Sequence, residues 1–247
     1  MKMYWSDEYK VHSYEIDEYS NASFTAICNF MQETAWNHAE NLQVGFSQLI
    51  ERGLVWVLSR QRIRVHRYPR WGDRIIVNTW PSGMDRMYCY RDFKVETPEH
   101  ETLVTATSTW FVIDMKSRRP QRTETFIDLR PEAPERMFDA FAVKLDRMSE
   151  GGEESLRSVL FSDMDVNGHL NNVNYMKYVI DSMPREFIQT NRLTELEINY
   201  LNEGLYGDTV VISRQDNGNG EIQFGLRRQG TGEEMCRART VWSALKS

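Results

Sequence analysis

The sequence has no long apolar run, no signal-like start and no excess of positive charge, and each absence excludes a class of protein. Nothing in it approaches the roughly 18 consecutive apolar residues of a membrane-spanning helix. Its first residues, Met1 to Glu8, lack the basic and apolar regions of a signal peptide, so we expect a cytoplasmic protein. The formal net charge of −6 argues against a nucleic-acid partner.

Cysteine is scarce as well. Cys28, Cys89 and Cys236 are odd in number, lie far apart and form no CxxC pair, so neither a disulfide framework nor a zinc site is indicated. We expect buried thiols, and we predict no metal and no cofactor. The chain does have enough apolar residues to fold, because 247 residues with 40% hydrophobic content suffice for one large core or two smaller ones.

An internal repeat organises the chain. Residues 58–77 and 193–212 both contain an alternating segment, a turn, an aromatic–Gly–Asp triplet and a β-branched run, which predicts strand, loop and strand twice over. A candidate helix precedes each copy, at 24–42 and at 174–187. Further strands are predicted downstream, where 106–110 in the first half corresponds to 238–242 in the second.

This order of elements predicts the fold. A helix that is apolar on several faces, followed by an antiparallel meander, is best buried when the sheet curls around it. We therefore expect an α+β tandem (double) hotdog, with a long central helix wrapped by a curved antiparallel sheet in each half and the two sheets joined edge to edge. The N-terminal hotdog with its connecting segment is assigned to 1–145 and the C-terminal hotdog to 146–247. Within the connection, 135–145 is compatible with a strand or a short helix.

Polar groups suited to acyl chemistry are concentrated directly before the second helix. The stretch from Asp165 to Tyr175, DVNGHLNNVNY, contains one Asp, one His and four Asn. The first half has no counterpart of Asn167 or His169, and it has a tyrosine where the second copy has Glu203, so only the second half is expected to be catalytic. The competing interpretation is local, because Asp and Asn before a helix commonly act as caps or turn formers.

Long motifs in both halves resemble the plant-type acyl-ACP thioesterases. The first half contains QETAWNH at 32–38 and RYPRWGD at 67–73, and the second contains the pattern Asp-x-Asn-x-His-x-Asn-Asn-x-x-Tyr followed by Glu203. The resemblance covers nearly the whole chain. It implies hydrolysis of the thioester between a fatty acyl chain and the phosphopantetheine arm of acyl carrier protein, ACP. Because no transit-like segment precedes the first motif, we expect a bacterial member of the family.

The resemblance implies that Asp165, Asn167, His169 and Glu203 form the catalytic set. Thioester hydrolysis needs a base for water, a donor for the oxyanion and a group that orients the base. Either Glu203 or His169 is the base, Asn167 positions the nucleophile or the carbonyl, and Asp165 fixes the loop. Backbone N–H groups at the start of the second helix are further oxyanion donors to consider. Many plant members have a cysteine after the glutamate, but this chain has Gly204, so we expect water to attack directly.

The first half, which lacks catalytic groups, is expected to shape the acyl-binding tunnel. Phe30, Met31 and Trp56 are candidates for lining it, and plain core packing is the alternative for each. From the second half, Asn172 is a candidate for reaching the substrate.

Because ACP is acidic, we expect basic side chains near the tunnel mouth. Alternation along the strand at 59–66 places Arg60, Arg62 and Arg64 on one face, which is typical of a docking patch. The rival interpretation pairs these arginines with Glu195, Glu197 and Asn199 across the joined sheets. Docking then depends on the remaining basic candidates, which include Arg118, Arg119 and Lys177.

Other functions remain open at this point. A hotdog acyl-CoA thioesterase performs the same hydrolysis, a dehydratase would leave the thioester intact, and a non-enzymatic acyl-thioester binding protein would only hold it. The tandem repeat supplies what single hotdogs gain by dimerising, so both a monomer and a homodimer are compatible with the sequence. Acyl chain length is not encoded in any local pattern.

Overall fold

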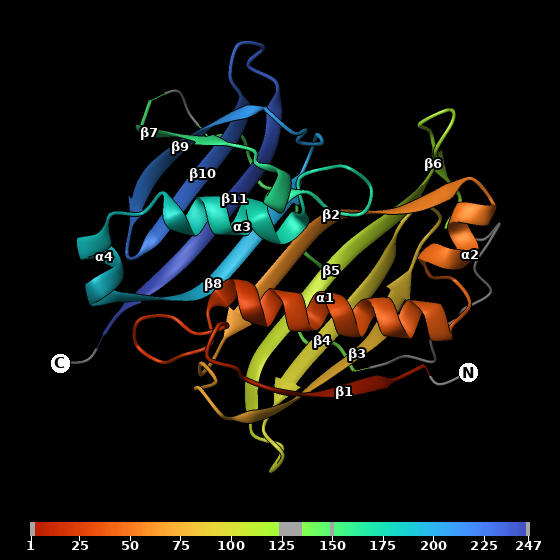
Figure 1. Cartoon of the computed structure of the whole chain (residues 1–247), viewed down its shortest axis with the longest axis horizontal. Helices are drawn as coiled ribbons and strands as arrows, with labels where there is room; N and C mark the ends of the chain where they lie inside the picture. Colours follow the sequence, from red (N-terminus) through yellow and green to blue (C-terminus); the bar gives the residue numbers. More distant parts are fainter. Residues whose placement is uncertain (1–2, 124–134, 149–150, 246–247) are drawn as a thin grey trace. The chain divides into compact units, whose positions relative to one another are not determined.

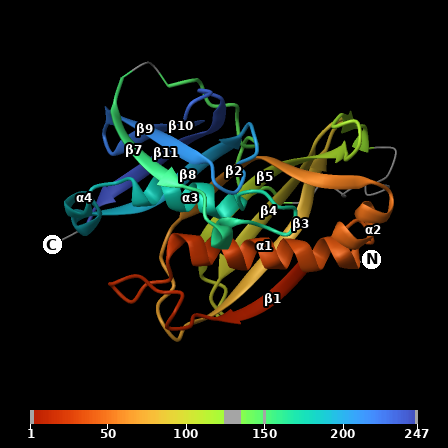
Figure 2. The same ribbon diagram turned by 45° about the horizontal axis from the view of Figure 1, so that its top comes forward.

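The computed structural model describes residues 3–123, 135–148 and 151–245. The chain divides into two compact units, Met1–Ala142 and Val143–Ser247, which we call unit 1 and unit 2. Each unit combines a helix with an antiparallel sheet (Figures 1 and 2). The predicted double hotdog fold is confirmed. The unit boundary after Ala142 lies three residues before the end of the predicted 1–145 segment.

Unit 1 contains helices α1 (Phe24–Asn41) and α2 (Phe46–Glu51). Its sheet has the order β1-β3-β4-β5-β2, and every neighbouring pair is antiparallel. The strands are β1 (Trp5–Lys10), β2 (Leu54–Val65), β3 (Arg74–Met84), β4 (Cys89–Glu96) and β5 (Thr102–Asp114), and the short β6 (Pro120–Gln121) pairs with β5.

Helix α1 confirms the helix predicted at 24–42 and lies across the strands of its sheet (Figure 1). It begins where the Ser23 side chain accepts a hydrogen bond from the Ala26 N–H. Ile27 and Met31, one turn apart, are almost completely buried, so this face of the helix forms the core of unit 1.

Unit 2 repeats the arrangement with the sheet order β8-β11-β10-β9-β7. Its strands are β7 (Glu153–Ser158), β8 (Asn191–Tyr200), β9 (Thr209–Gly218), β10 (Glu221–Arg228) and β11 (Glu234–Ala244). The repeat is therefore confirmed, because its two copies fold as β2–β3 and as β8–β9. A short 3-10 turn, η2 (Phe161–Asp163), follows β7.

The second predicted helix, 174–187, is wrong in its extent. The structure has two helices there, α3 (Asn172–Asp181) and α4 (Arg185–Thr190). Pro184 stands between them as the N-cap of α4, because proline lacks an N–H and clashes with the preceding turn of a helix. At its other end α3 starts earlier than predicted, since Asn171 caps the Val173 N–H.

Residues 135–145 of the connecting segment form neither the strand nor the helix that their sequence allowed. Its first part packs on unit 1, where the Met137 N–H donates to Asp92 at 2.8 Å and Phe141 stacks on Tyr90. Its second part packs on unit 2, where the Leu145 N–H donates to Asn199 at 2.7 Å. Side chains thus satisfy the backbone of an irregular segment that runs along strands.

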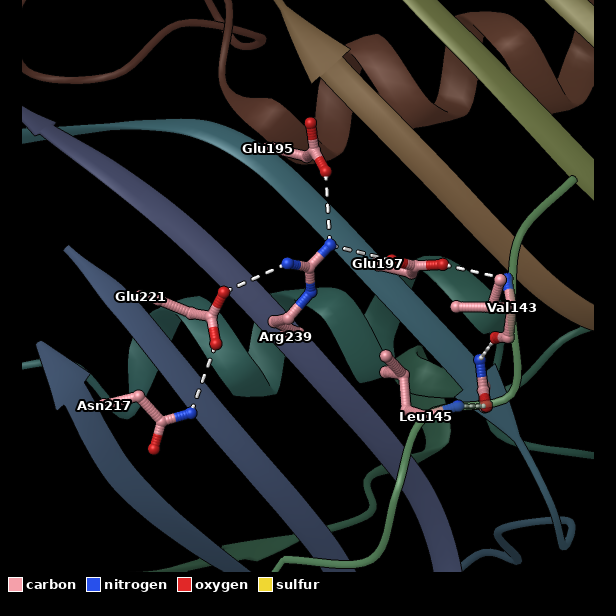
Figure 3. A network of polar contacts seen from close by, with 8 residues as sticks. Val143, Leu145, Glu195, Glu197, Asn217, Glu221 and Arg239 are labelled. Carbon is pink, nitrogen blue, oxygen red and sulfur yellow. Dashed lines mark hydrogen bonds and ion pairs between the residues drawn. The ribbon is translucent and has the colours of Figure 1, made fainter. Parts of the chain in front are cut away.

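A polar network on the sheet of unit 2 gives the acidic side chains of β8 a partner within their own unit. Arg239 of β11 lies 3.4 Å from Glu195, 3.0 Å from Glu197 and 3.0 Å from Glu221 of β10 (Figure 3). Glu197 also accepts a hydrogen bond from the Val143 N–H, so the network holds the connecting segment as well.

Candidate active site

The loop between η2 and α3 is organised by the carboxylate of Asp165. This side chain accepts hydrogen bonds from the Asn167 N–H at 2.8 Å and the His169 N–H at 3.2 Å. The Asp165 N–H donates in turn to the His169 carbonyl at 2.7 Å. These bonds close a tight turn, and Gly168 adopts a φ of 75° in it, a conformation that strongly favours glycine. Asp165 therefore acts as a turn former that fixes the backbone on both sides of Gly168.

His169 and Glu203 meet although they come from different loops. The His169 Nε2 atom lies 3.4 Å from the Glu203 Oε2 atom. Both side chains are partly exposed, at 30% and 40%, so a water molecule or a substrate can reach them. Asn167 is exposed in the same loop. The structure thus brings Asp165, Asn167 and His169 together on one loop and places Glu203 beside His169.

Close packing at Gly204 holds the two loops together. The Leu170 N–H donates to the Gly204 carbonyl at 2.8 Å. A Cβ atom at residue 204 would lie only 2.8 Å from the Leu170 Cβ and 3.0 Å from the Met235 Cε. The position after Glu203 therefore has no room for the cysteine side chain that many plant members have, unless Leu170 moves.

Two of the predicted oxyanion donors at the start of α3 are engaged within the protein. The Val173 N–H donates to the Asn171 side chain, and the Asn174 N–H donates to the Asn171 carbonyl. Because Asn171 uses these two donors, it has the local capping role that the sequence left open. Asn172 lies at the first position of α3, and its carbonyl accepts a hydrogen bond from the Tyr200 hydroxyl.

Sequence reasoning missed Asp163, a buried acid two residues before Asp165. Its carboxylate accepts hydrogen bonds from the Tyr178 hydroxyl at 2.8 Å and the Leu160 N–H at 2.9 Å. Its carbonyl accepts from the Asn171 N–H and the Asn174 side chain. Burial, followed by the hydrogen bond to Asp163, raises the pKa of Tyr178, so the phenol stays a donor. No sequence signal separated this acid from an ordinary turn residue.

The predicted tunnel residues all lie in unit 1. Phe30 and Met31 are buried on α1, and the Phe30 ring contacts Tyr9 of β1. Trp56 on β2 is half-buried, and its indole N–H donates to the Val44 carbonyl at 2.8 Å. These positions are compatible with an acyl-binding wall and with plain core packing.

The predicted docking residues differ in exposure. Arg60 and Arg62 are half-buried on β2, and the Arg62 guanidinium lies 4.7 Å from the centre of the Phe138 ring. Arg118, Arg119 and Lys177 are exposed. Arg62 therefore packs against Phe138 of the connecting segment within unit 1, whether or not it also binds ACP.

The three cysteines are unsuited to nucleophilic attack. Cys28 and Cys236 are buried, and burial raises the pKa of each thiol. Cys89 is half-buried rather than buried as expected, yet burial still raises the pKa of its thiol to about 12. Because the thiolate is the reactive form, these side chains are inert near neutral pH.

Within residues 3–123, 135–148 and 151–245, no cluster of three or more His, Cys, Asp or Glu side chains could hold a metal ion. No helix in these segments is long and apolar enough to cross a membrane.

Comparison with known proteins identifies the family. Residues 2–128 match the acyl-ACP thioesterase N-terminal domain, and residues 147–244 match the acyl-ACP thioesterase C-terminal domain. The chain belongs to the acyl-ACP thioesterase family. This confirms the resemblance inferred from the sequence motifs.

Curated relatives of this acyl-ACP thioesterase family member include plant enzymes. The palmitoyl-acyl carrier protein thioesterase of Cuphea hookeriana is 30% identical over 95% of this chain and 61% of its own length. The oleoyl-acyl carrier protein thioesterase 1 of Arabidopsis thaliana is 27% identical over 96% of this chain and 75% of its own length. The chain spans about three fifths of the length of the Cuphea relatives.

Solved structures show the same fold. An acyl-ACP thioesterase from Bacteroides thetaiotaomicron superposes with a TM-score of 0.85 at 23% identity, covering 98% of both chains. The 12:0-ACP thioesterase from Umbellularia californica superposes with a TM-score of 0.83 at 23% identity, covering 99% of both chains. Both likenesses extend over both units.

Proposed function

We propose that the chain hydrolyses fatty acyl-ACP thioesters to free fatty acid and holo-ACP, with activated water as the nucleophile. The observation that carries the proposal is the pairing of His169 with Glu203 at 3.4 Å in the unit that matches the thioesterase C-terminal domain. The plant relatives, a palmitoyl- and an oleoyl-acyl carrier protein thioesterase, support the same reaction. A cytoplasmic location stays a prediction.

In the proposed mechanism, the Glu203 carboxylate accepts a proton from water while the oxygen of that water attacks the thioester carbonyl. The tetrahedral intermediate then collapses, and the carbon–sulfur bond breaks. His169, beside Glu203, gives a proton to the departing phosphopantetheine sulfur. The proton that Glu203 took from water then passes to His169, so both groups return to their starting states. The exposed Asn167 side chain supplies an amide donor for the oxyanion. His169 as the base is the alternative division of the same two roles.

The first test is the paired substitution of the two partners. Removing a general base costs about 10²- to 10⁴-fold in rate, so we expect Glu203→Gln to lower kcat within that range. His169→Gln is expected to have a comparable effect, because each group needs the other. Glu99→Gln serves as the control, since Glu99 is an exposed carboxylate in the β4–β5 turn of unit 1. Release of radiolabelled fatty acid from acyl-ACP is the measurement. A Glu203→Gln variant as fast as Glu99→Gln would remove Glu203 from the mechanism.

A second test separates the carriers. An acyl-ACP thioesterase should cleave the ACP thioester with a higher kcat/KM than the CoA thioester of the same acyl chain. Equal or reversed preference would favour the acyl-CoA thioesterase, and tight binding without turnover would favour a non-enzymatic binding protein. Profiling the fatty acids released in cells that express the chain then gives the acyl chain length that the enzyme accepts. In this proposal Phe30, Met31 and Trp56 line the acyl-binding tunnel, and Asn172 contacts the substrate.

We also propose that exposed basic residues dock ACP, because its acidic surface favours cationic partners. Charge reversal of Arg118 and Arg119 together, or of Lys177, should raise KM for acyl-ACP and leave KM for acyl-CoA unchanged. Arg62→Glu should instead lower stability, since Arg62 packs on Phe138. If charge reversal at the exposed sites leaves KM for acyl-ACP unchanged, ACP docks elsewhere.

A further inference from the structure

The loop that carries Glu203 has no regular secondary structure, yet its backbone is held at three consecutive carbonyls. The Asn202 carbonyl accepts from the Tyr175 hydroxyl at 3.1 Å, and the Glu203 carbonyl accepts from Arg228 at 2.8 Å. The Gly204 carbonyl accepts from the Leu170 N–H at 2.8 Å. The three donors come from helix α3, from strand β10 and from the loop between η2 and α3. Each carbonyl around Glu203 is thus fixed by a different part of unit 2.

Arg228 is oriented for this contact by two carboxylates. Its Nε atom donates to Asp208 at 3.0 Å, and its NH1 group pairs with Glu233, which leaves NH2 directed at the Glu203 carbonyl. Asp208 also accepts from the Leu205 N–H at 2.9 Å, so the same ion pair ties down the far side of the loop. A planar guanidinium presents these donors on three separate nitrogen atoms in fixed directions, whereas the ammonium group of lysine has its donors on one atom.

Tyr175 is built to remain a donor. It is buried on α3, and burial, more than any nearby charge, raises the pKa of its phenol. Its hydroxyl therefore stays protonated throughout the neutral range and keeps its bond to the Asn202 carbonyl.

We propose that Arg228 and Tyr175 are positioning residues that hold the Glu203 carboxylate against His169. Neither side chain is assigned a contact with substrate, and both act through the backbone of residues 202 and 203. The inference rests on the proposed function, because it presumes that the His169–Glu203 pair performs the reaction. A displacement of about 1 Å at a reacting group costs on the order of 100-fold in rate, so a loop of irregular backbone needs such tethers.

The test replaces Arg228 and its neighbour on the same strand. Arg228→Met should lower kcat for acyl-ACP about 10- to 100-fold with KM little changed, because only the geometry of the reacting groups is disturbed. Arg228→Lys should keep the charge and the stability yet recover only part of kcat. Arg227→Met is the matched control, since Arg227 also makes an ion pair, with Glu154 at 2.6 Å, but does not contact the loop. Tyr175→Phe should lower kcat in the same direction.

A double-mutant cycle distinguishes positioning from general stability. In single-turnover measurements, Arg228→Met added to Glu203→Gln should cause almost no further loss, because the tether acts through a carboxylate that is already gone. The inference would be overturned if Arg228→Met lowered the rate equally in the unchanged chain and in Glu203→Gln, or if Arg227→Met lowered it as much as Arg228→Met. Neither result would contradict the proposed hydrolysis itself. A Glu203→Gln variant of unchanged rate would instead refute the mechanism on which the inference rests.

Discussion

Substitution of Gly204 by alanine tests how closely the loops that carry His169 and Glu203 must pack. The added Cβ would lie 2.8 Å from the Leu170 Cβ, whereas ordinary van der Waals contact begins at 3.4 Å. Leu170 must therefore retreat by about 0.6 Å, and it is the immediate neighbour of His169. Since the His169–Glu203 separation is already 3.4 Å, we expect the retreat to weaken this contact and to lower kcat about 10-fold. Overpacking of this kind also costs about 1–3 kcal/mol of unfolding free energy.

The control is Gly225→Ala in strand β10 of the same unit. Among the described residues, a Cβ there meets only the Met148 Cβ within 4 Å, at an ordinary 3.9 Å, so kcat and stability should stay near those of the unchanged chain. Hydrolysis of acyl-ACP and urea unfolding, measured for both variants, give the comparison. A Gly204→Ala chain that matches Gly225→Ala in both assays would show that the loops tolerate separation and that close packing at Gly204 does not set the geometry.

Three further predictions follow from individual contacts. Alkylation with iodoacetamide at neutral pH should leave hydrolysis unchanged, because burial raises the pKa of Cys28, Cys89 and Cys236; inactivation that tracks the labelling of one cysteine would restore a thiol mechanism. Tyr178→Phe should cost about 1–3 kcal/mol in urea unfolding, since the buried Asp163 carboxylate loses the phenol at 2.8 Å, and an unchanged midpoint would contradict this. Hydrogen bonds from Arg237 lower the pKa of Glu234 below its usual 4.5, so the stability that this pair contributes should be present above pH 4.5 and disappear as pH falls through the lowered pKa. The measurement is the difference in unfolding free energy between Glu234→Gln and the unchanged chain, and a difference that persists in acid would refute the assignment.

Patterns of local sequence were sufficient for the repeat and the fold class. They also singled out the loop that contains three of the four proposed catalytic residues, although the roles of those residues came from the family resemblance. Asp165, Asn167 and His169 lie within five positions of one another, so their proximity is guaranteed by the covalent chain. Periodicity along the strands and the apolar face of α1 carry the same kind of information, because they repeat over a few residues. Glu203 was assigned through resemblance, since a glutamate in a turn has no distinctive local signal.

Errors and omissions arose where the outcome depended on contacts distant in sequence. The second helix ends earlier than its apolar pattern indicated, because Pro184 interrupts it. Residues 135–148 of the connecting segment have no regular secondary structure, since side chains such as Asp92 in unit 1 and Asn199 in unit 2 accept hydrogen bonds from their backbone. Asp163 escaped notice because its importance comes from burial against Tyr178, fifteen residues away.

The sequence by itself determined that this chain is a tandem hotdog with one polar, catalytic-type loop, because periodicity, repetition and motif spacing are properties of neighbouring residues. Only the tertiary structure decided how Glu203 reaches His169, why residue 204 is a glycine and which side chains hold the Glu203 loop. Those facts depend on distances between α3, β10 and two loops that are remote along the chain. They are set by packing and hydrogen bonding, which no local pattern records.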